Sequence, residues 1–242
     1  MRDFAAETEK RIAFIQDCLK NSSASGIVFG NSGGKDAALV GVLCKLACEN
    51  TVGIIMPCQT KRNYGSDMAD GKLFAEQFNI ETRIVDLTSQ KLQAIESLSE
   101  ISKLNEGAIT NIAPRLRMMT LYAIAASENR LVAGTGNRSE IYMGYFTKWG
   151  DGAYDFNPIA DLTVTEIYEY LKYLKVPANI IEKAPSGGLR DGQTDEEDMG
   201  ISYTAIDQYL LSGKVSEKDR QIIEDFHTRS EHKRKLPIVY GR

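Results

Sequence analysis

Residues 26–37 decide the fold of this chain: Gly26-Ile27-Val28-Phe29-Gly30-Asn31-Ser32-Gly33-Gly34-Lys35-Asp36-Ala37. The apolar run Ile27–Phe29 is typical of a buried strand in a parallel sheet. A glycine-rich turn follows, and apolar residues then recur at helical spacing from Leu39 to Leu46. At such a helix start the first backbone N–H groups point into the turn, and the helix dipole favours an anion there. The stretch therefore predicts a phosphate site.

This turn differs from the phosphate loop of the common nucleotide-hydrolysing enzymes. Three residues separate Gly30 from Gly34 where that loop has four, and Lys35 is followed by Asp36 rather than Ser or Thr. An acidic side chain in the first turn would repel phosphate unless a cation lay between them. Asp36 is therefore interpreted as a Mg²⁺ ligand, because Mg²⁺ in proteins is bound by one or two carboxylates plus substrate phosphates. The alternative is a solvent-facing acid that only complements the helix dipole.

Strands and helices alternate along the rest of the chain. Further strands are predicted at 52–56, 82–86 and 131–134, with helices at 2–20, 66–78, 114–129 and 163–174. The alternation indicates an α/β fold with an open parallel sheet flanked by helices, in one domain over residues 1–242. The helix that Pro114 opens is apolar nearly all round, and we expect it to be buried.

Composition excludes several classes of protein. The chain is 43% hydrophobic with a net charge of −4, and no apolar run is long enough to span a membrane. The acidic N-terminus lacks a signal peptide, and four cysteines without paired spacing suit a reducing compartment, so we expect a cytoplasmic protein. The net charge argues against broad nucleic-acid binding. The two histidines both lie near the C-terminus, which argues against a Ser/His/Asp triad.

A ligand crevice is expected at the carboxyl ends of the strands. Open parallel sheets bind ligands there, so the turns after the first and fourth strands should face one crevice. The second of these turns, 134–139, resembles the start of a dinucleotide-binding fold, but it lacks the third glycine and follows the fourth strand rather than the first. A dinucleotide site of that type is therefore rejected.

Three later segments carry polar residues in patterns with more than one interpretation. Residues 140–158 form either a functional loop, whose aromatics could stack on a flat ring, or an ordinary packed loop. Residues 183–200 are rich in glycine and acids, which indicates a mobile lid over the site. The basic run 232–235 is either solvated or folded onto an anionic ligand.

The motifs together resemble one enzyme family. Ser32–Asp36 is similar to the signature of the N-type ATP pyrophosphatases, whose fold is of the adenine-nucleotide alpha-hydrolase type. Several further motifs resemble ammonia-dependent NAD synthetase in the right order: Asn111–Met118, GTGNRSE, GYFTKWGDGAYDFNPIADL, KAPSGGL, GQTDEEDMGISY and EHKRK. Glutamine-using relatives carry an extra amidase domain, for which this chain has no room.

The resemblance implies a reaction in two steps. The nicotinate carboxylate of deamido-NAD attacks the α-phosphorus of ATP, and ammonia then displaces AMP from the adenylate to give NAD. By resemblance the ATP-binding residues are Gly30, Asn31, Ser32, Gly33, Gly34, Lys35, Asp36, Ala37, Thr135 and Ser186. Asp36 and Glu140 hold Mg²⁺, and with Lys148 they form the catalytic set. The implied deamido-NAD ligands are Arg115, Lys148, Asp155, His232 and Lys233, in a homodimer whose interface the dinucleotide crosses.

Two positions depart from the family pattern. Ala37 stands where the signature has Ser or Thr, and Val164 stands where many members have a lysine that reaches ATP. Each departure puts one ATP contact in doubt. Two other readings stay open at this point: another ATP pyrophosphatase, such as a tRNA-modifying or sulfur-transfer enzyme, and a nucleotide-binding sensor that has lost catalysis.

Overall fold

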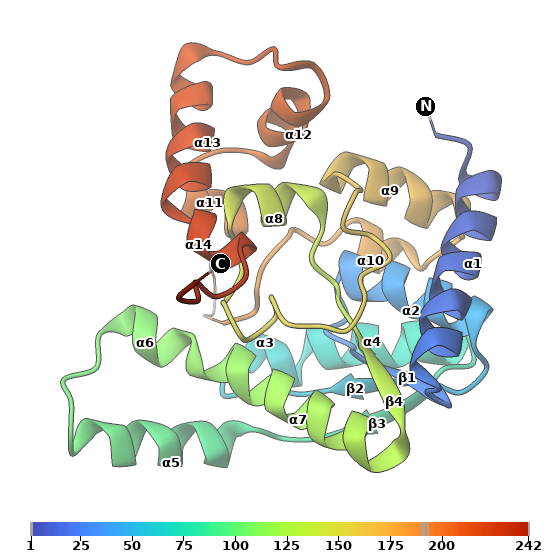
Figure 1. Cartoon of the computed structure of the whole chain (residues 1–242), viewed down its shortest axis with the longest axis horizontal. Helices are drawn as coiled ribbons and strands as arrows, with labels where there is room; N and C mark the ends of the chain where they lie inside the picture. Colours follow the sequence, from blue (N-terminus) through green and yellow to red (C-terminus); the bar gives the residue numbers. More distant parts are fainter. Residues whose placement is uncertain (1, 190–191, 193, 242) are drawn as a thin grey trace.

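The computed structural model describes residues 2–189, 192 and 194–241, and a four-stranded sheet lies at its centre (Figure 1). The strands are β1 Gly26–Gly30, β2 Thr51–Ile55, β3 Glu81–Ile84 and β4 Arg130–Ala133. Their order is β3-β2-β1-β4 and every neighbouring pair is parallel. The predicted open parallel sheet is confirmed. Because β1 is an interior strand, the glycine-rich turn that follows it emerges near the middle of the sheet.

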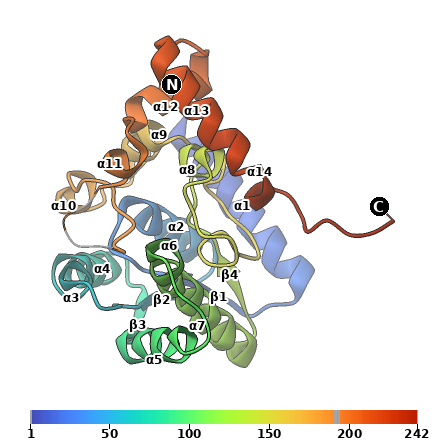
Figure 2. The same cartoon turned by 90° about the vertical axis from the view of Figure 1, so that its left-hand side faces the viewer.

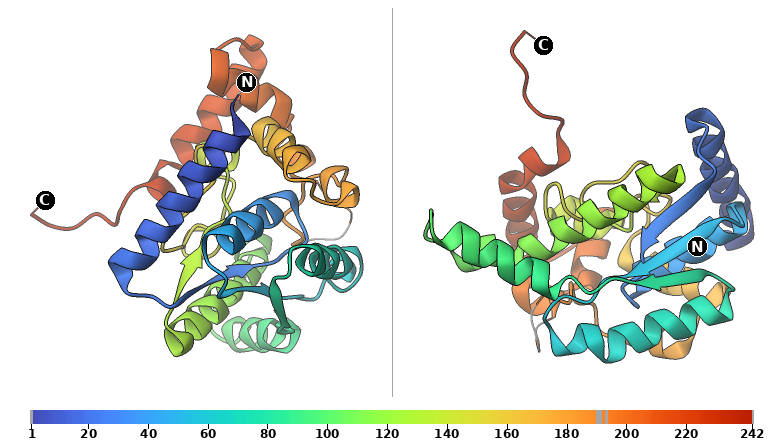
Figure 3. Two further views of the ribbon diagram at one scale, coloured as in Figure 1. Left: turned by 90° about the vertical axis from the view of Figure 1, so that its right-hand side faces the viewer. Right: turned by 90° about the horizontal axis from the view of Figure 1, so that it is seen from below.

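Side chains of β1 alternate between two cores. Ile27 and Phe29 point into one core, and Val28 points into the other. The first core is covered by α1 Phe4–Ser22, α2 Lys35–Ala47, α4 Ser66–Gln77, α9 Val164–Tyr173 and α10 Ala178–Ile181. The second is covered by α7 Ile112–Glu128, with α5 Thr88–Ser99 packed beside it (Figure 3). Burial on both faces explains why the strand is a continuous apolar run.

A third apolar cluster joins the helices of the C-terminal half. It contains residues of α8 Arg138–Met143, α11 Asp195–Met199, α12 Tyr203–Ser212 and α13 Glu217–Arg229 together with Val164 of α9, and these helices lie in the upper half of Figure 1. The short helices α3 Lys61–Tyr64, α6 Glu106–Thr110 and α14 Glu231–Arg234 complete the fold. Beyond α14 the chain extends away from the body (Figure 2). Among the described helices, none combines the length and the apolar character needed to cross a membrane.

The structure corrects three of the expected elements. Helix α7 is exposed along one side, where Met119 is 60% exposed, so the prediction that it is buried all round was wrong. Leu46, expected in the buried stripe of α2, is also exposed, whereas most of α2 before it is buried on every side. The expected long loop 140–158 begins only after α8, whose last residue is Met143. The first two errors share one origin: apolar content gives no information on which face of a helix other elements cover. The third is a short helix with a capping box at Asn137 and Glu140 that was expected to be loop.

Candidate active site

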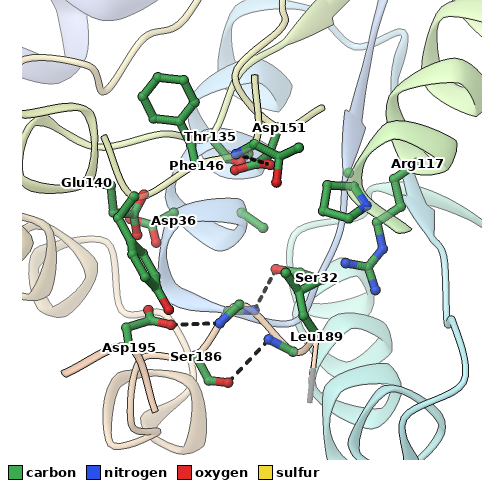
Figure 4. Close-up of a pocket in the computed structure, with 18 of the residues that line it drawn as sticks. Ser32, Asp36, Arg117, Thr135, Glu140, Phe146, Asp151, Ser186, Leu189 and Asp195 are labelled. Carbon is green, nitrogen blue, oxygen red and sulfur yellow. Dashed lines mark hydrogen bonds between the residues drawn. The ribbon is translucent and has the colours of Figure 1, made fainter. Parts of the chain in front are cut away.

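A cavity of about 820 Å³ opens at the carboxyl ends of β1, β2 and β4 (Figure 4). Its wall includes the turn after β1, the last residue of β4, Ala133, and the next two residues, Gly134 and Thr135, so the prediction that these two turns face one crevice is confirmed. The volume lies in the range of pockets that bind small molecules and cofactors. The cavity therefore has the place and the size that a nucleotide requires.

The turn between β1 and α2 is held by a buried asparagine. Asn31 donates from Nδ2 to the carbonyl of Gly71 on α4 at 2.9 Å and accepts from the N–H of Gly33 at 3.2 Å. Gly33 has φ +67°, and a Cβ there would lie 2.2 Å from the carbonyl oxygen of Asp67. Only glycine allows the turn to approach α4 this closely. Its shape is thus fixed by contacts with a neighbouring helix as well as by its own sequence.

Helix α2 begins at the cavity without a side-chain cap. Gly34 occupies the N-cap position, and no side chain accepts from the N–H groups of the first turn. The N–H of Gly34 itself bonds to Ser32 Oγ at 3.3 Å. An uncapped helix start on a cavity wall is a favourable site for an anion, because both the N–H groups and the dipole attract it. The predicted phosphate site therefore has the required geometry.

Asp36 and Glu140 lie on the same wall of the cavity, although they come from α2 and α8 (Figure 4). Asn137 connects them: its Nδ2 donates to Asp36 Oδ1 at 3.1 Å, and its backbone N–H donates to Glu140 Oε2 at 3.3 Å. The Lys35 ammonium lies 2.7 Å from Asp36 Oδ2 and 3.7 Å from Glu140 Oε1. Burial, together with repulsion from Asp36, raises the pKa of Glu140 to about 8. The charge of Lys35 opposes that rise, and a divalent cation between the two carboxylates would lower the pKa further.

A third acid reaches this wall from α11. Asp195 is only 4% exposed, and its carboxylate accepts from the N–H of Gly187 at 2.9 Å and from the hydroxyl of Tyr203 at 3.2 Å. Burial raises its pKa, and the charge of Lys35 opposes the shift. Asp195 was not predicted as a site residue, although it lies in the GQTDEEDMGISY motif. Nothing in the sequence distinguishes it from its three acidic neighbours, because burial is set by packing.

The remaining predicted ATP ligands also line the cavity. Thr135 follows β4, and Ser186 lies on the segment before α11, where its hydroxyl accepts from the N–H of Gly188. Lys183 binds Asp67 and Asp70 of α4 at 2.6 and 2.7 Å and was not predicted as a site residue. Of the proposed lid, residues 190, 191 and 193 lie outside the described residues. The mobility of this segment stays a prediction.

The predicted deamido-NAD ligands are divided between the cavity and its outer edge. Only Lys233 lines the cavity; its ammonium donates to the carbonyls of Gly144 and Phe146, both at 2.8 Å. Lys148 donates to the carbonyl of His232 at 2.8 Å, and Arg115 lies next to it, bonded to the carbonyl of Lys148 at 3.4 Å. The basic run is thus folded onto the loop after α8, and Lys233 is half-buried and bonded to protein carbonyls rather than fully solvated.

Asp155 lies apart from the other predicted substrate ligands. Its carboxylate accepts from the N–H of Val132 on β4 at 2.7 Å and from the hydroxyl of Tyr122 on α7 at 3.1 Å. It is exposed and does not line the cavity.

Opposite the acidic wall, Arg117 lines the cavity and donates to the carbonyl of Met56 and to Asn63 (Figure 4). Burial lowers the pKa of Arg117, which was not predicted as a site residue.

Val164 does not line the cavity. It is buried at the start of α9 in the apolar cluster that also contains Met143 and Tyr203. A longer side chain at this position would have to displace packed neighbours. Ala37, by contrast, is a cavity residue with its methyl group almost fully buried. The two departures from the family pattern therefore differ in their surroundings.

Comparison with known proteins identifies the family. The family model described as NAD synthase matches residues 7–237. The chain belongs to the NAD synthase family. Among curated relatives, the NH(3)-dependent NAD(+) synthetase of Carboxydothermus hydrogenoformans is 43% identical over 236 residues, which cover 96% of each chain. The NAD synthase family membership and the parallel sheet together confirm the expected fold.

Two solved structures refine the comparison. An NMN synthetase from Francisella tularensis superposes with a TM-score of 0.94 at 38% identity, covering 100% of both chains. An NH3-dependent NAD synthetase from Campylobacter jejuni superposes with a TM-score of 0.79 at 33% identity, covering 99% of both. The identities are similar, but the backbone follows the first structure more closely than the second.

Proposed function

We propose that the protein catalyses the ATP-dependent amidation of deamido-NAD with ammonia, giving NAD, AMP and pyrophosphate through an adenylate. Family membership supports the reaction class, a carbon–nitrogen ligation driven by ATP. The observation that carries the proposal is the uncapped start of α2 beside Asp36 and Glu140 in one cavity. The other ATP pyrophosphatases and the catalytically inactive sensor are not favoured.

The first step needs an activated carboxylate. A carboxylate is a poor acyl donor, and adenylation gives it AMP as a leaving group. The triphosphate of ATP would lie at the turn 30–37, where the N–H groups of α2 hold its oxygens, with Thr135 and Ser186 on either side. These groups fix the phosphates in place and stabilise the charge that develops when pyrophosphate leaves. Ammonia then displaces AMP, and the energy of ATP has been used to form the amide.

The donor set near Asp36 fits Mg²⁺ bound together with nucleotide. Within the described part of the chain, no group of three or more His, Cys, Asp or Glu side chains could hold a metal ion by itself. Two carboxylates from Asp36 and Glu140, completed by phosphate oxygens and water, are the usual environment of Mg²⁺ in nucleotide sites. When bound, the ion would neutralise phosphate charge. We propose Asp36 and Glu140 as its protein ligands.

The deamido-NAD site is proposed to form across a homodimer. Arg115, Lys148, Asp155 and His232 lie on the outer edge, where α7 also exposes Met119 and Tyr122. An exposed apolar helix face beside charged residues is typical of a surface that another chain covers. A second subunit on this face would turn the outer edge into an enclosed binding site. We place the enzyme in the cytoplasm, where its four free cysteines stay reduced.

A direct assay tests the proposal. Purified protein is incubated with deamido-NAD, ATP, Mg²⁺ and ammonium, and release of AMP and pyrophosphate is measured together with NAD. We expect all three products in equal amounts, and very little turnover when glutamine replaces ammonium. Absence of AMP release with every nicotinate-containing substrate would support the sensor. AMP release only with a tRNA or sulfur-carrier substrate would support another pyrophosphatase.

A second candidate concerns the carboxylate substrate. The backbone matches an NMN synthetase with a TM-score of 0.94, against 0.79 for an NAD synthetase of comparable identity. A ligase that forms NMN amidates nicotinate mononucleotide, which carries the same reacting carboxylate without the adenylate half. The ATP site is common to both reactions. The ratio of kcat/KM for the two carboxylates decides between them: a ratio above one for the mononucleotide favours the second candidate.

A further inference from the structure

Lys35 is a buried cation in the first turn of α2. Its side chain is 6% exposed and lines the cavity, and its ammonium contacts the two proposed metal ligands, Asp36 at 2.7 Å and Glu140 at 3.7 Å. The ring of Tyr203 lies 5.5 Å from the same ammonium. A buried lysine is stable only when its charge is paired, and here both partners are carboxylates with another proposed role. The ammonium thus occupies the position between two ligands where a metal ion would bind.

The ammonium and a metal ion would need the same two carboxylates. Asp36 and Glu140 both contact the Lys35 ammonium, and both are the proposed ligands of Mg²⁺. Like charges at close range repel strongly in a buried site, so Mg²⁺ and the ammonium cannot both lie between Asp36 and Glu140. Binding of the metal must therefore displace Lys35.

We propose that Lys35 is a tethered cation of the ATP site, which lies against Asp36 and Glu140 before nucleotide binds and turns to the phosphate oxygens when Mg²⁺ takes the two carboxylates. This inference rests on the proposed ATP-binding function. The ammonium carries three donors on a flexible stem of four carbons, so it can exchange one anion for another within the cavity. Because Lys35 is the first residue of α2, its backbone N–H also points to the expected phosphate position.

The proposal has two consequences of opposite sign. Without nucleotide, the ammonium competes with divalent metal, so removing it should tighten metal binding. With nucleotide, the ammonium contributes a charge-assisted hydrogen bond to phosphate, so removing it should weaken the binding of MgATP. A lysine that only supports the fold would not produce this pair of effects.

The experiment compares Lys35→Met with the native protein and with Lys91→Met. Lys91 is equally buried, at 6% exposed, but it lies in α5 and does not line the cavity. Binding of Mn²⁺ to nucleotide-free protein is measured by electron paramagnetic resonance, and binding of MgATP by calorimetry. For Lys35→Met we expect Mn²⁺ affinity to rise by about tenfold and MgATP affinity to fall by roughly tenfold to hundredfold. Lys91→Met should change neither by more than about twofold.

Several results would overturn the proposal. If Lys35→Met changes the affinities for Mn²⁺ and MgATP in the same direction, or binds MgATP more tightly, Lys35 does not exchange the carboxylates for phosphate. If Lys35→Met does not fold, the binding of Mn²⁺ to the nucleotide-free native protein is the test. A Kd below about 0.1 mM would exclude a competing ammonium, and a higher Kd would support one. Failure of the native protein to bind MgATP would instead refute the proposed function.

Discussion

The two ends of the site differ in how completely one chain builds them. At the phosphate end, hydrogen bonds join Asn137 to Asp36 and hold the turn 30–37 against α4, and every predicted ATP ligand except Gly33 lines the cavity. At the outer edge, four of the five predicted deamido-NAD ligands lie outside the cavity lining, beside the exposed face of α7. The difference supports the proposal that a single chain builds the ATP site and only part of the carboxylate site.

The physical reason lies in the kind of contact that each ligand half needs. Phosphate is held by N–H groups and cations on rigid elements, which one fold can supply at a helix start. A flat nicotinate ring and a second nucleotide need enclosing surface, which one sheet edge cannot supply. A partner subunit can add this surface at small cost, because the face it covers is already apolar.

The largest effect on turnover is expected at the phosphate end of the site. Asp36→Asn should lower kcat by roughly a hundredfold to a thousandfold, because it weakens the cation that neutralises phosphate charge. Steady-state kinetics at saturating Mg²⁺ measures it, and Glu49→Gln on the exposed surface is the control. Turnover within about threefold of the native rate would mean that Asp36 is not a metal ligand.

The turn itself can be tested with a matched pair of glycines. Gly33 and Gly213 both have positive φ, but a Cβ on Gly33 meets the backbone of Asp67, whereas a Cβ on Gly213 meets no atom within 4 Å. Gly213→Ala should cost about 1 kcal/mol of unfolding free energy from backbone strain. Gly33→Ala should cost about 2–3 kcal/mol more, because α4 must shift. Chemical denaturation measures both, and equal losses would contradict the close approach to α4.

The raised pKa of Glu140 predicts a pH dependence of stability. Its ordinary value is 4.5 and its folded value is about 8, so between these values the unfolded chain releases a proton that the folded protein keeps. The free energy of unfolding of nucleotide-free protein should therefore fall as pH rises from 4.5 to 8 and then level off. The free energy of unfolding of the Glu140→Gln variant should fall by about 1–3 kcal/mol less than that of the native protein over this pH range. Identical pH profiles for the two proteins would show that Glu140 is ionised without metal.

The smallest effect is expected at Ala37. Ala37→Ser adds a hydroxyl on the cavity wall that can donate to a phosphate oxygen, and water can already replace part of that bond. We expect kcat/KM for ATP to rise by roughly threefold to tenfold with little change in stability. Kinetics at saturating deamido-NAD and ammonia measures it. A large loss would mean that the turn is packed around the methyl group, and recovery from an inactive native protein would favour the sensor.

The sequence predicts the phosphate end of the site better than the outer edge. The strand, turn and helix at 26–47 and the shared crevice were predicted because their signals are local: an apolar run, glycines and an acid at fixed spacing. The exposed side of α7 was not predicted. Its apolar residues indicate that the helix is covered, but they do not indicate whether the same chain or another chain covers it. Asp195 and Arg117 were missed because only packing brings them to the cavity. The long-range juxtapositions of this site thus required the structure.

The most direct test asks whether a second subunit completes the deamido-NAD site but not the ATP site. Met119→Arg places a charge on the exposed face of α7, and Leu211→Arg on exposed α12 is the control. Sedimentation gives the oligomeric state, and calorimetry gives the binding of MgATP and of deamido-NAD. We predict that Met119→Arg is monomeric, binds MgATP within about threefold of the native Kd, and binds deamido-NAD at least about tenfold more weakly. A monomer that binds deamido-NAD with native affinity would contradict a carboxylate site completed by a second subunit.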